Sequence, residues 1–187
     1  MAQTLDQIER IGAKVLLKNQ FNELKTDGFF EPNSPQTDKY NCIAFAMGLE
    51  DWWVDPYPNV PGHWWPPTVV QDMDPSILIQ AFEYLGFEKC ENGVPEIGFE
   101  KVALYRKYVD SFKRIVWTHA AKIVGLDKYH SKLGPSYDVF HSSSSTFGYG
   151  EIFQFMRRST SLPLTSQRKD TADDGDIEID DSISISF

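Results

Sequence analysis

The spacing of apolar residues changes near residue 99, and this change restricts the chain to few fold classes. In the first 86 residues, apolar side chains recur at intervals of three and four, the pattern of amphipathic helices. After residue 99 they alternate with polar residues or form short β-branched runs, which is typical of strands. Helices followed by an antiparallel sheet define an α+β domain, and we expect N-terminal helices packed on a C-terminal sheet.

Three helices are predicted in the first half of the chain. The first spans residues 5–24, and its apolar residues are Leu5, Ile8, Ile11, Val15, Leu16 and Phe21. The second begins near Cys42 and ends near Gly48. The third begins at Asp74-Pro75, because aspartate caps a helix well and the first helical position tolerates proline.

Four strands are predicted in the second half, at residues 102–105, 114–124, 128–133 and 150–157. The turn at 125–127 joins the second and third of them into a hairpin. A short segment at 137–141 stays unassigned. We therefore divide the chain into an N-terminal helix (1–28), a single α+β domain (29–158) and an acidic C-terminal tail (159–187).

Charge excludes some function classes. The formal net charge is -9 and the pI is near 4.9, which argues against a nucleic-acid or anionic-membrane surface. Residues 165–187 hold seven acidic and two basic residues and little to bury, so we expect a disordered tail that is a candidate partner contact. We see no signal peptide and no membrane-length apolar run, and we expect a cytoplasmic protein with reduced cysteines.

Cys42 is the first candidate for chemistry. It follows the turn-forming residues 33–38 and opens an apolar segment, so we expect it in the first turn of a helix capped by Asp38 or Asn41. The positive end of the helix dipole favours a thiolate there. The plainer interpretation is a small core residue, which is the usual role of a cysteine in an apolar segment.

The segment 51–67 combines five prolines with four tryptophans, Trp52, Trp53, Trp64 and Trp65. The prolines prevent a long regular element, yet the tryptophans need burial or a partner. We expect an ordered aromatic loop beside the site, where Asn41, Lys132 and the four tryptophans would bind substrate. A loop that only covers the core is the alternative.

His119 is the candidate base for Cys42, since an imidazole can take the thiol proton and then needs an acceptor to hold its ring. The register of the hairpin decides which residue orients it. A three-residue loop puts Ser131 on the face of His119, whereas a loop of two or four residues puts His130 and Lys132 there. Asp138 is the best acid downstream, and we rank it with Ser131.

Oxyanion stabilisation needs donors beside the thiol. The backbone N–H of Cys42, at a helix start, is a natural donor to a tetrahedral intermediate. Gln36, six residues earlier, is a candidate second donor.

Several motifs together resemble an uncharacterised bacterial domain family. They are Tyr40-Asn41-Cys42-Ile43-Ala44-Phe45-Ala46, the two Trp-Trp pairs, 98–103, Thr118-His119-Ala120-Ala121, and Ser131-Lys132-Leu133-Gly134 with Asp138 and His141. The resemblance covers residues 30 to 158 and implies relatives rather than an activity. More distantly, the order Cys, His, polar residue is similar to papain-like and NlpC-like peptidases. That resemblance implies Cys42 as nucleophile, His119 as base and Ser131 as the orienting residue.

We therefore predict a cysteine hydrolase or acyltransferase that acts on an amide or thioester of a peptide or protein, without a cofactor. The alternative is a catalytically inactive module of the same fold that binds a partner through the tryptophan loop and the acidic tail. A zinc site is a third interpretation, because His119, His130 and His141 with Cys42 have suitable ligand atoms.

Overall fold

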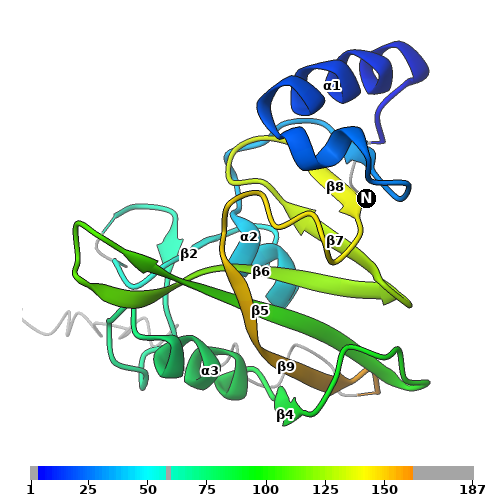
Figure 1. The fold of residues 1–187 in the computed structure, drawn as a ribbon. Helices are drawn as coiled ribbons and strands as arrows, with labels where there is room; N and C mark the ends of the chain where they lie inside the picture. Colours follow the sequence, from blue (N-terminus) through cyan, green and yellow to red (C-terminus); the bar gives the residue numbers. More distant parts are fainter. Residues whose placement is uncertain (1–3, 58–59, 162–187) are drawn as a thin grey trace, which may run out of the picture.

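The computed structural model describes residues 4–57 and 60–161. Its centre is a seven-stranded sheet in the order β1-β8-β7-β6-β5-β9-β4, with every neighbouring pair antiparallel (Figure 1). The strands are β1 (Glu31–Ser34), β4 (Glu88–Cys90), β5 (Phe99–Val109), β6 (Arg114–Gly125), β7 (Lys128–Lys132), β8 (Asp138–His141) and β9 (Glu151–Ser159). The fold is thus mixed α/β with a large antiparallel sheet and few helices.

The helices are α1 (Gln7–Gln20), the 3₁₀-helix η1 (Asn22–Lys25), α2 (Cys42–Met47) and α3 (Pro75–Tyr84). α2 packs on β6 and β7, and α3 packs on β6. α1 lies at the far end of the sheet and packs on the edge strand β1 (Figure 1). A parallel pair, β2 (Trp53–Val54) and β3 (His63–Trp64), holds the tryptophan-rich segment together.

Alternate residues of the strands face opposite sides of the sheet. Leu104 and Ala120 join the large core that α2 and α3 cover. Tyr105 and Ala121 join a smaller cluster with Tyr129. His119 is paired with Tyr105 across β5 and β6, so it belongs to the second face, away from α2.

α1 packs with a different side from the one that its apolar stripe indicates. Ala13 and Leu17 are buried, and Leu17 joins a cluster with Leu24 of η1. The stripe residues Ile8, Ile11, Val15 and Leu16 are all at least half exposed. The helix also begins two residues later than expected, because Asp6 caps it through a capping box with Glu9.

Two edge strands, β1 and β4, were not predicted. Both are short, and Pro32 lies within β1, where a proline is tolerated only because an edge strand leaves one side of its backbone unpaired. The unassigned segment 137–141 forms β8, which pairs with β7. The predicted tail lies mostly outside the described residues.

The described part of the chain contains no helix that combines the length and the apolar character needed to cross a membrane.

Candidate active site

Cys42 is the first residue of α2, and Asn41 fixes the start of that helix. The side-chain oxygen of Asn41 accepts the N–H of Ala44 at 3.0 Å, and its amide donates to the carbonyl of Val54 at 2.7 Å. Asn41 is buried. Its polar atoms are therefore used to cap α2 and to hold the chain at Val54, and not to bind substrate as the sequence analysis proposed.

The thiol of Cys42 is enclosed, although the residue keeps a partly exposed surface. Burial raises the pKa of this thiol to about 11. The backbone N–H groups of Ala120, Ile43 and Cys42 itself, and then the Lys132 ammonium, act in the opposite direction. The resting group is a thiol, surrounded by donors that would stabilise an anion.

The sulfur lies where β6 and β7 separate. The pairing between these strands runs over Lys122, Ile123 and Gly125 of β6, so Ala120 lies beyond it. The N–H of Ala120 faces the thiol, and the neighbouring residue in β6 is His119. The opening between the strands thus brings a helix-borne thiol to the backbone beside a strand-borne imidazole.

His119 is the end of a buried chain of hydrogen bonds. Its Nε2 lies 2.9 Å from Oγ of Ser131, and that hydroxyl lies 2.8 Å from Nε2 of His141. Nδ1 of His141 lies 2.7 Å from the carbonyl oxygen of Ser142. All four residues are at most 8% exposed, so little water competes with these bonds.

The Ser142 carbonyl fixes every proton in this chain. A carbonyl only accepts, so Nδ1 of His141 must donate. Burial lowers the pKa of His141 to about 4, so its ring is neutral and its Nε2 accepts from Ser131. The Ser131 hydroxyl then accepts from Nε2–H of His119. Burial holds the pKa of His119 well below its usual range, so its Nδ1 carries a lone pair.

Nδ1 of His119 is buried and has no hydrogen-bond partner among the described residues. The ring of Tyr149 stacks on His119 with centroids 4.1 Å apart and an angle of 3° between the planes. Tyr105 contacts the imidazole edge to face at 5.3 Å. Burial raises the pKa of Tyr149, and the charge of a Cys42 thiolate would raise it further, which indicates that the thiol, the tyrosine and the imidazole share one region.

Of the residues ranked to orient His119, the structure brings Ser131 to it. Asp138 lies on the opposite face of the sheet, because it pairs with Lys132 in β8–β7, one position along from Ser131. Its carboxylate accepts from the hydroxyl of Ser34 at 2.6 Å and lies 3.3 Å from Nε2 of His130. The assignment of Asp138 to His119 is therefore wrong, and Asp138 serves His130 instead.

Lys132 is fully buried on the α2 face, so it does not form an open substrate contact. Its Nζ donates to the carbonyl oxygens of Gly134, at 2.8 Å, and Ser136. Burial lowers its pKa to about 8, while the charges of Asp138 and Cys42 oppose that shift. Lys132 is thus a cation held by backbone carbonyls close enough to influence the thiol.

The tryptophans divide into packed and exposed residues. Trp65 is buried and stacks on Trp117 with centroids 6.1 Å apart, so it belongs to the core. Trp53 stacks on His63, and Trp64 contacts Tyr84. Trp52 is 38% exposed. Of the four tryptophans predicted to bind substrate, Trp65 is thus a core residue, whereas the other three keep some exposed surface.

Sequence reasoning missed His141, Tyr149 and the backbone of Ala120 as parts of this site. On sequence alone, His141 was named only among the family motifs and as a candidate zinc ligand. Its role depends on β8 lying beside β7, which the unassigned segment at 137–141 concealed. Gln36, the candidate oxyanion donor, is exposed.

The zinc interpretation is not supported. In residues 4–57 and 60–161, no group of three or more His, Cys, Asp or Glu side chains could hold a metal ion. The alternation of the strands explains this, because His119 and His141 share one face while His130 packs with Phe45 on the other.

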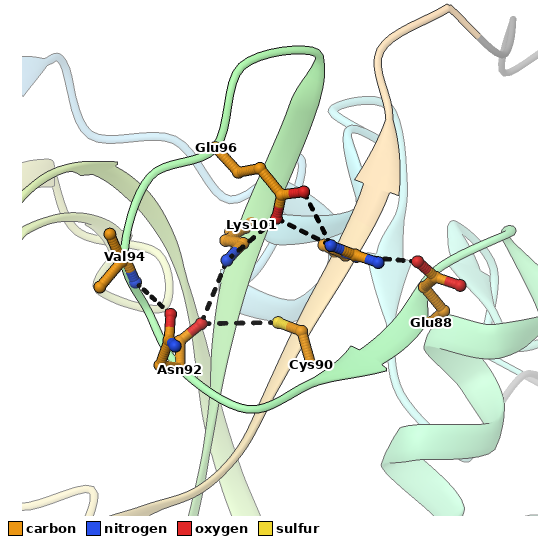
Figure 2. Close-up of polar contacts among 7 residues, drawn as sticks. Glu88, Cys90, Asn92, Val94, Glu96 and Lys101 are labelled. Atoms are coloured by element: carbon orange, nitrogen blue, oxygen red, sulfur yellow. Dashed lines mark hydrogen bonds and ion pairs between the residues drawn. The ribbon is translucent and has the colours of Figure 1, made fainter.

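Cys90 lies in a separate surface pocket of about 540 Å³. Figure 2 shows its sulfur and the Lys101 ammonium converging on the carbonyl oxygen of Asn92, at 3.5 Å and 3.4 Å. Glu96 accepts from both Lys101 and Arg157. The charged side chains of this pocket thus pair with each other. Both Cys42 and Cys90 are free thiols.

These features define a mixed α/β domain in which a half-buried cysteine and a hydrogen-bonded chain of two histidines and a serine lie where two strands of the sheet separate. The family model described as Domain of unknown function (DUF7689) matches residues 31–157, and the chain belongs to this family. Comparison with curated proteins and with solved structures finds no match. α1, η1 and Asp27 precede the matched region.

Proposed function

We propose that the protein is a cysteine hydrolase or acyltransferase that acts on an amide or thioester bond through an acyl intermediate on Cys42. The hydrogen-bond chain from Ser142 to His119 carries this proposal. It leaves Nδ1 of His119 unprotonated, beside the strand opening that holds the thiol. An oriented imidazole with a free lone pair is the base that such chemistry needs.

The reaction would proceed in two halves. Nδ1 of His119 takes the thiol proton, and the sulfur of Cys42 attacks the carbonyl carbon to form a C–S bond. The N–H groups that face the sulfur, those of Cys42 and Ala120, are the candidate donors to the developing oxyanion. The intermediate collapses by breaking the bond to the leaving group, which takes the proton from His119. Water or another nucleophile then cleaves the thioester, again with His119 as base.

The order of the groups supports a papain-like assignment. A cysteine at a helix start, a histidine on a strand and a polar residue on the next strand follow the layout of those peptidases. A peptide or protein substrate fits that assignment, and Trp52, Trp53 and Trp64 are the tryptophans of the aromatic loop that keep some exposure for it. Two free thiols fit a reducing compartment such as the cytoplasm.

A small activated ester tests the proposal. Incubation with p-nitrophenyl acetate in a Cys90→Ser background should give an acetyl adduct on Cys42, detected by mass spectrometry. His119→Ala should slow its formation by about 100-fold or more, the usual contribution of a general base. His130→Ala, which changes a histidine on the other face, should not. Equal rates in the two histidine variants, or no adduct on Cys42, would refute the mechanism.

One observation favours a second function, that of a non-catalytic binding module. Burial raises the pKa of Cys42 and lowers that of His119, so proton transfer from the thiol to the imidazole is unfavourable in this state. In that case the exposed Trp52 and Tyr57 would form the interface together with the acidic tail, which lies mostly outside the described residues. Weaker capture of a partner by Trp52→Ala, without any acyl adduct on Cys42, would support this function.

A further inference from the structure

We propose that Asp27 is a latch that keeps the site closed. The covering loop, residues 142–149, lies over His119, and the N-terminal arm, residues 4–29, holds that loop in place through Asp27. Access to the site would therefore be controlled by whether the arm stays docked. This inference rests on the proposed function, because it concerns access to Cys42 and His119.

Asp27 binds the covering loop through one carboxylate oxygen. Oδ2 accepts the backbone N–H of Ser142 at 2.8 Å, its hydroxyl at 3.1 Å and the hydroxyl of Ser145 at 2.6 Å. The other oxygen accepts the N–H of Phe29 within the arm. Hydrogen bonds to a charged carboxylate are stronger than neutral ones, so Asp27 is the main polar tie between arm and loop.

The covering loop closes the site from the side of His119. Tyr149, its last residue, stacks flat on the imidazole, and its carbonyl accepts the hydroxyl of Thr118 at 2.5 Å. Phe147 is buried and contacts His141 at 4.8 Å. His119 is 1% exposed as a result. A substrate could not reach its free nitrogen unless this loop moved.

The arm also packs against the loop with apolar side chains. Phe21 meets Phe147 edge to face at 5.2 Å, and Leu17 and Leu24 join the same buried cluster. The left-handed backbone of Phe147, with φ of 53°, is costly for a bulky residue and needs such support. The arm precedes residues 31–157, so Asp27 lies outside the region that the family model matches.

Access can be measured without any catalytic activity. In a Cys90→Ser background, the rate of Cys42 alkylation by iodoacetamide reports how often the site opens. Asp27→Asn keeps the size of the side chain but loses the charge. It should speed alkylation by at least about tenfold, the order expected when charge-assisted bonds that oppose a local opening are weakened. Asp6→Asn, which changes the cap of α1 on the same arm, is the matched control.

Hydrogen exchange of the same variants separates local opening from unfolding. Asp27→Asn should raise exchange in residues 142–149 and leave β5 and β6 protected. Ser145→Ala, which removes one of the three bonds to Oδ2, should give a smaller rise in both readouts. Alkylation within about twofold of the Asp6→Asn control would overturn the latch, as would exchange that rises equally across β5 and β6.

The two proposals can fail separately. Faster alkylation of Asp27→Asn with no acetyl adduct in any variant would support the latch and refute the proposed enzymatic activity. An acetyl adduct that depends on His119, with an alkylation rate unchanged by Asp27→Asn, would support the enzymatic activity and refute the latch.

Discussion

Nε2 of His119 and Oγ of Ser131 lie 2.9 Å apart and join β6 to β7 beside the region where those strands separate. The serine is also 2.8 Å from His141, so one hydroxyl orients two imidazoles. The neighbouring residue, Lys132, points to the other face and lies close enough to influence the thiol. Of two consecutive residues of β7, Ser131 therefore orients His119, and Lys132 influences the thiol of Cys42.

Ser131→Ala should be strongly destabilising, although it removes only one hydroxyl group. It leaves Nε2 of His119 and Nε2 of His141 buried without their partner, and each such loss costs about 1–3 kcal/mol. We expect the free energy of unfolding in urea to fall by about 2 kcal/mol or more. Ser159→Ala, which changes a partly exposed serine of β9, should change it by less than about 0.5 kcal/mol. Similar losses in both variants would contradict the proton assignment of the chain.

The sequence offered this serine as one of several candidates and did not indicate its second partner. The loop between Gly125 and Lys128 has two residues, a length for which we expected His130 and Lys132 on the face of His119. A bulge between Ile123 and Gly125 shifts the register by one residue and brings Ser131 to that face instead. His141 belongs to β8, whose position depends on packing with the arm and with β1. The prediction that Asp138 orients His119 was wrong for the same reason. Without the pairing of β8 with β7, the sequence did not determine which face of the sheet carries Asp138.

The helices show the same limit. The start of α3 at Asp74 and the end of α2 at Gly48 were predicted correctly from the residue types near each helix end. The buried side of α1 was not, since four exposed apolar residues give a stronger stripe than Ala13 and Leu17. Which side of a helix packs is decided by the partner, here η1 and the covering loop.

Asn41→Ala tests whether this asparagine is structural. Its side chain accepts from Ala44 and is tied to Val54, so its loss removes a helix cap and leaves buried backbone groups unpaired. We expect the free energy of unfolding to fall by about 1–3 kcal/mol. Asn92→Ala, an exposed asparagine of the Cys90 pocket, should cost less. Unchanged stability with weakened substrate binding would restore the role first assigned to Asn41.

Cys42 should react slowly in the wild-type protein. Its thiol is enclosed and its pKa is raised to about 11, so little thiolate exists near neutral pH. We expect alkylation at least about tenfold slower than at Cys90, which lines an open pocket, as measured by mass spectrometry of peptides. Cys42→Ala should cost about 1 kcal/mol of stability, a modest core truncation. Faster labelling of Cys42 than of Cys90 at pH 6 would instead reveal a resting thiolate–imidazolium pair.

Stability should fall as the pH drops from 7 to 5. The pKa of His141 is lowered to about 4 and that of His119 is also lowered, whereas both lie near 6.5 in an unfolded chain. Between these values the unfolded state binds protons that the folded state does not, so acid favours unfolding. For His141 alone the loss is about 2 kcal/mol at pH 5 relative to pH 8.

Carboxylates do not explain a loss of stability between pH 7 and pH 5. The pKa values of Asp27 and Asp138 are lowered, so their contribution is lost only below the ordinary carboxyl range, near pH 4. Urea denaturation at pH 5, 6, 7 and 8 measures the slope. His141→Gln should flatten it because that proton is no longer taken up on unfolding. A wild-type profile that is level between pH 7 and pH 5 would mean that the buried histidines are not held neutral, and the proton order from Ser142 to His119 would then be wrong.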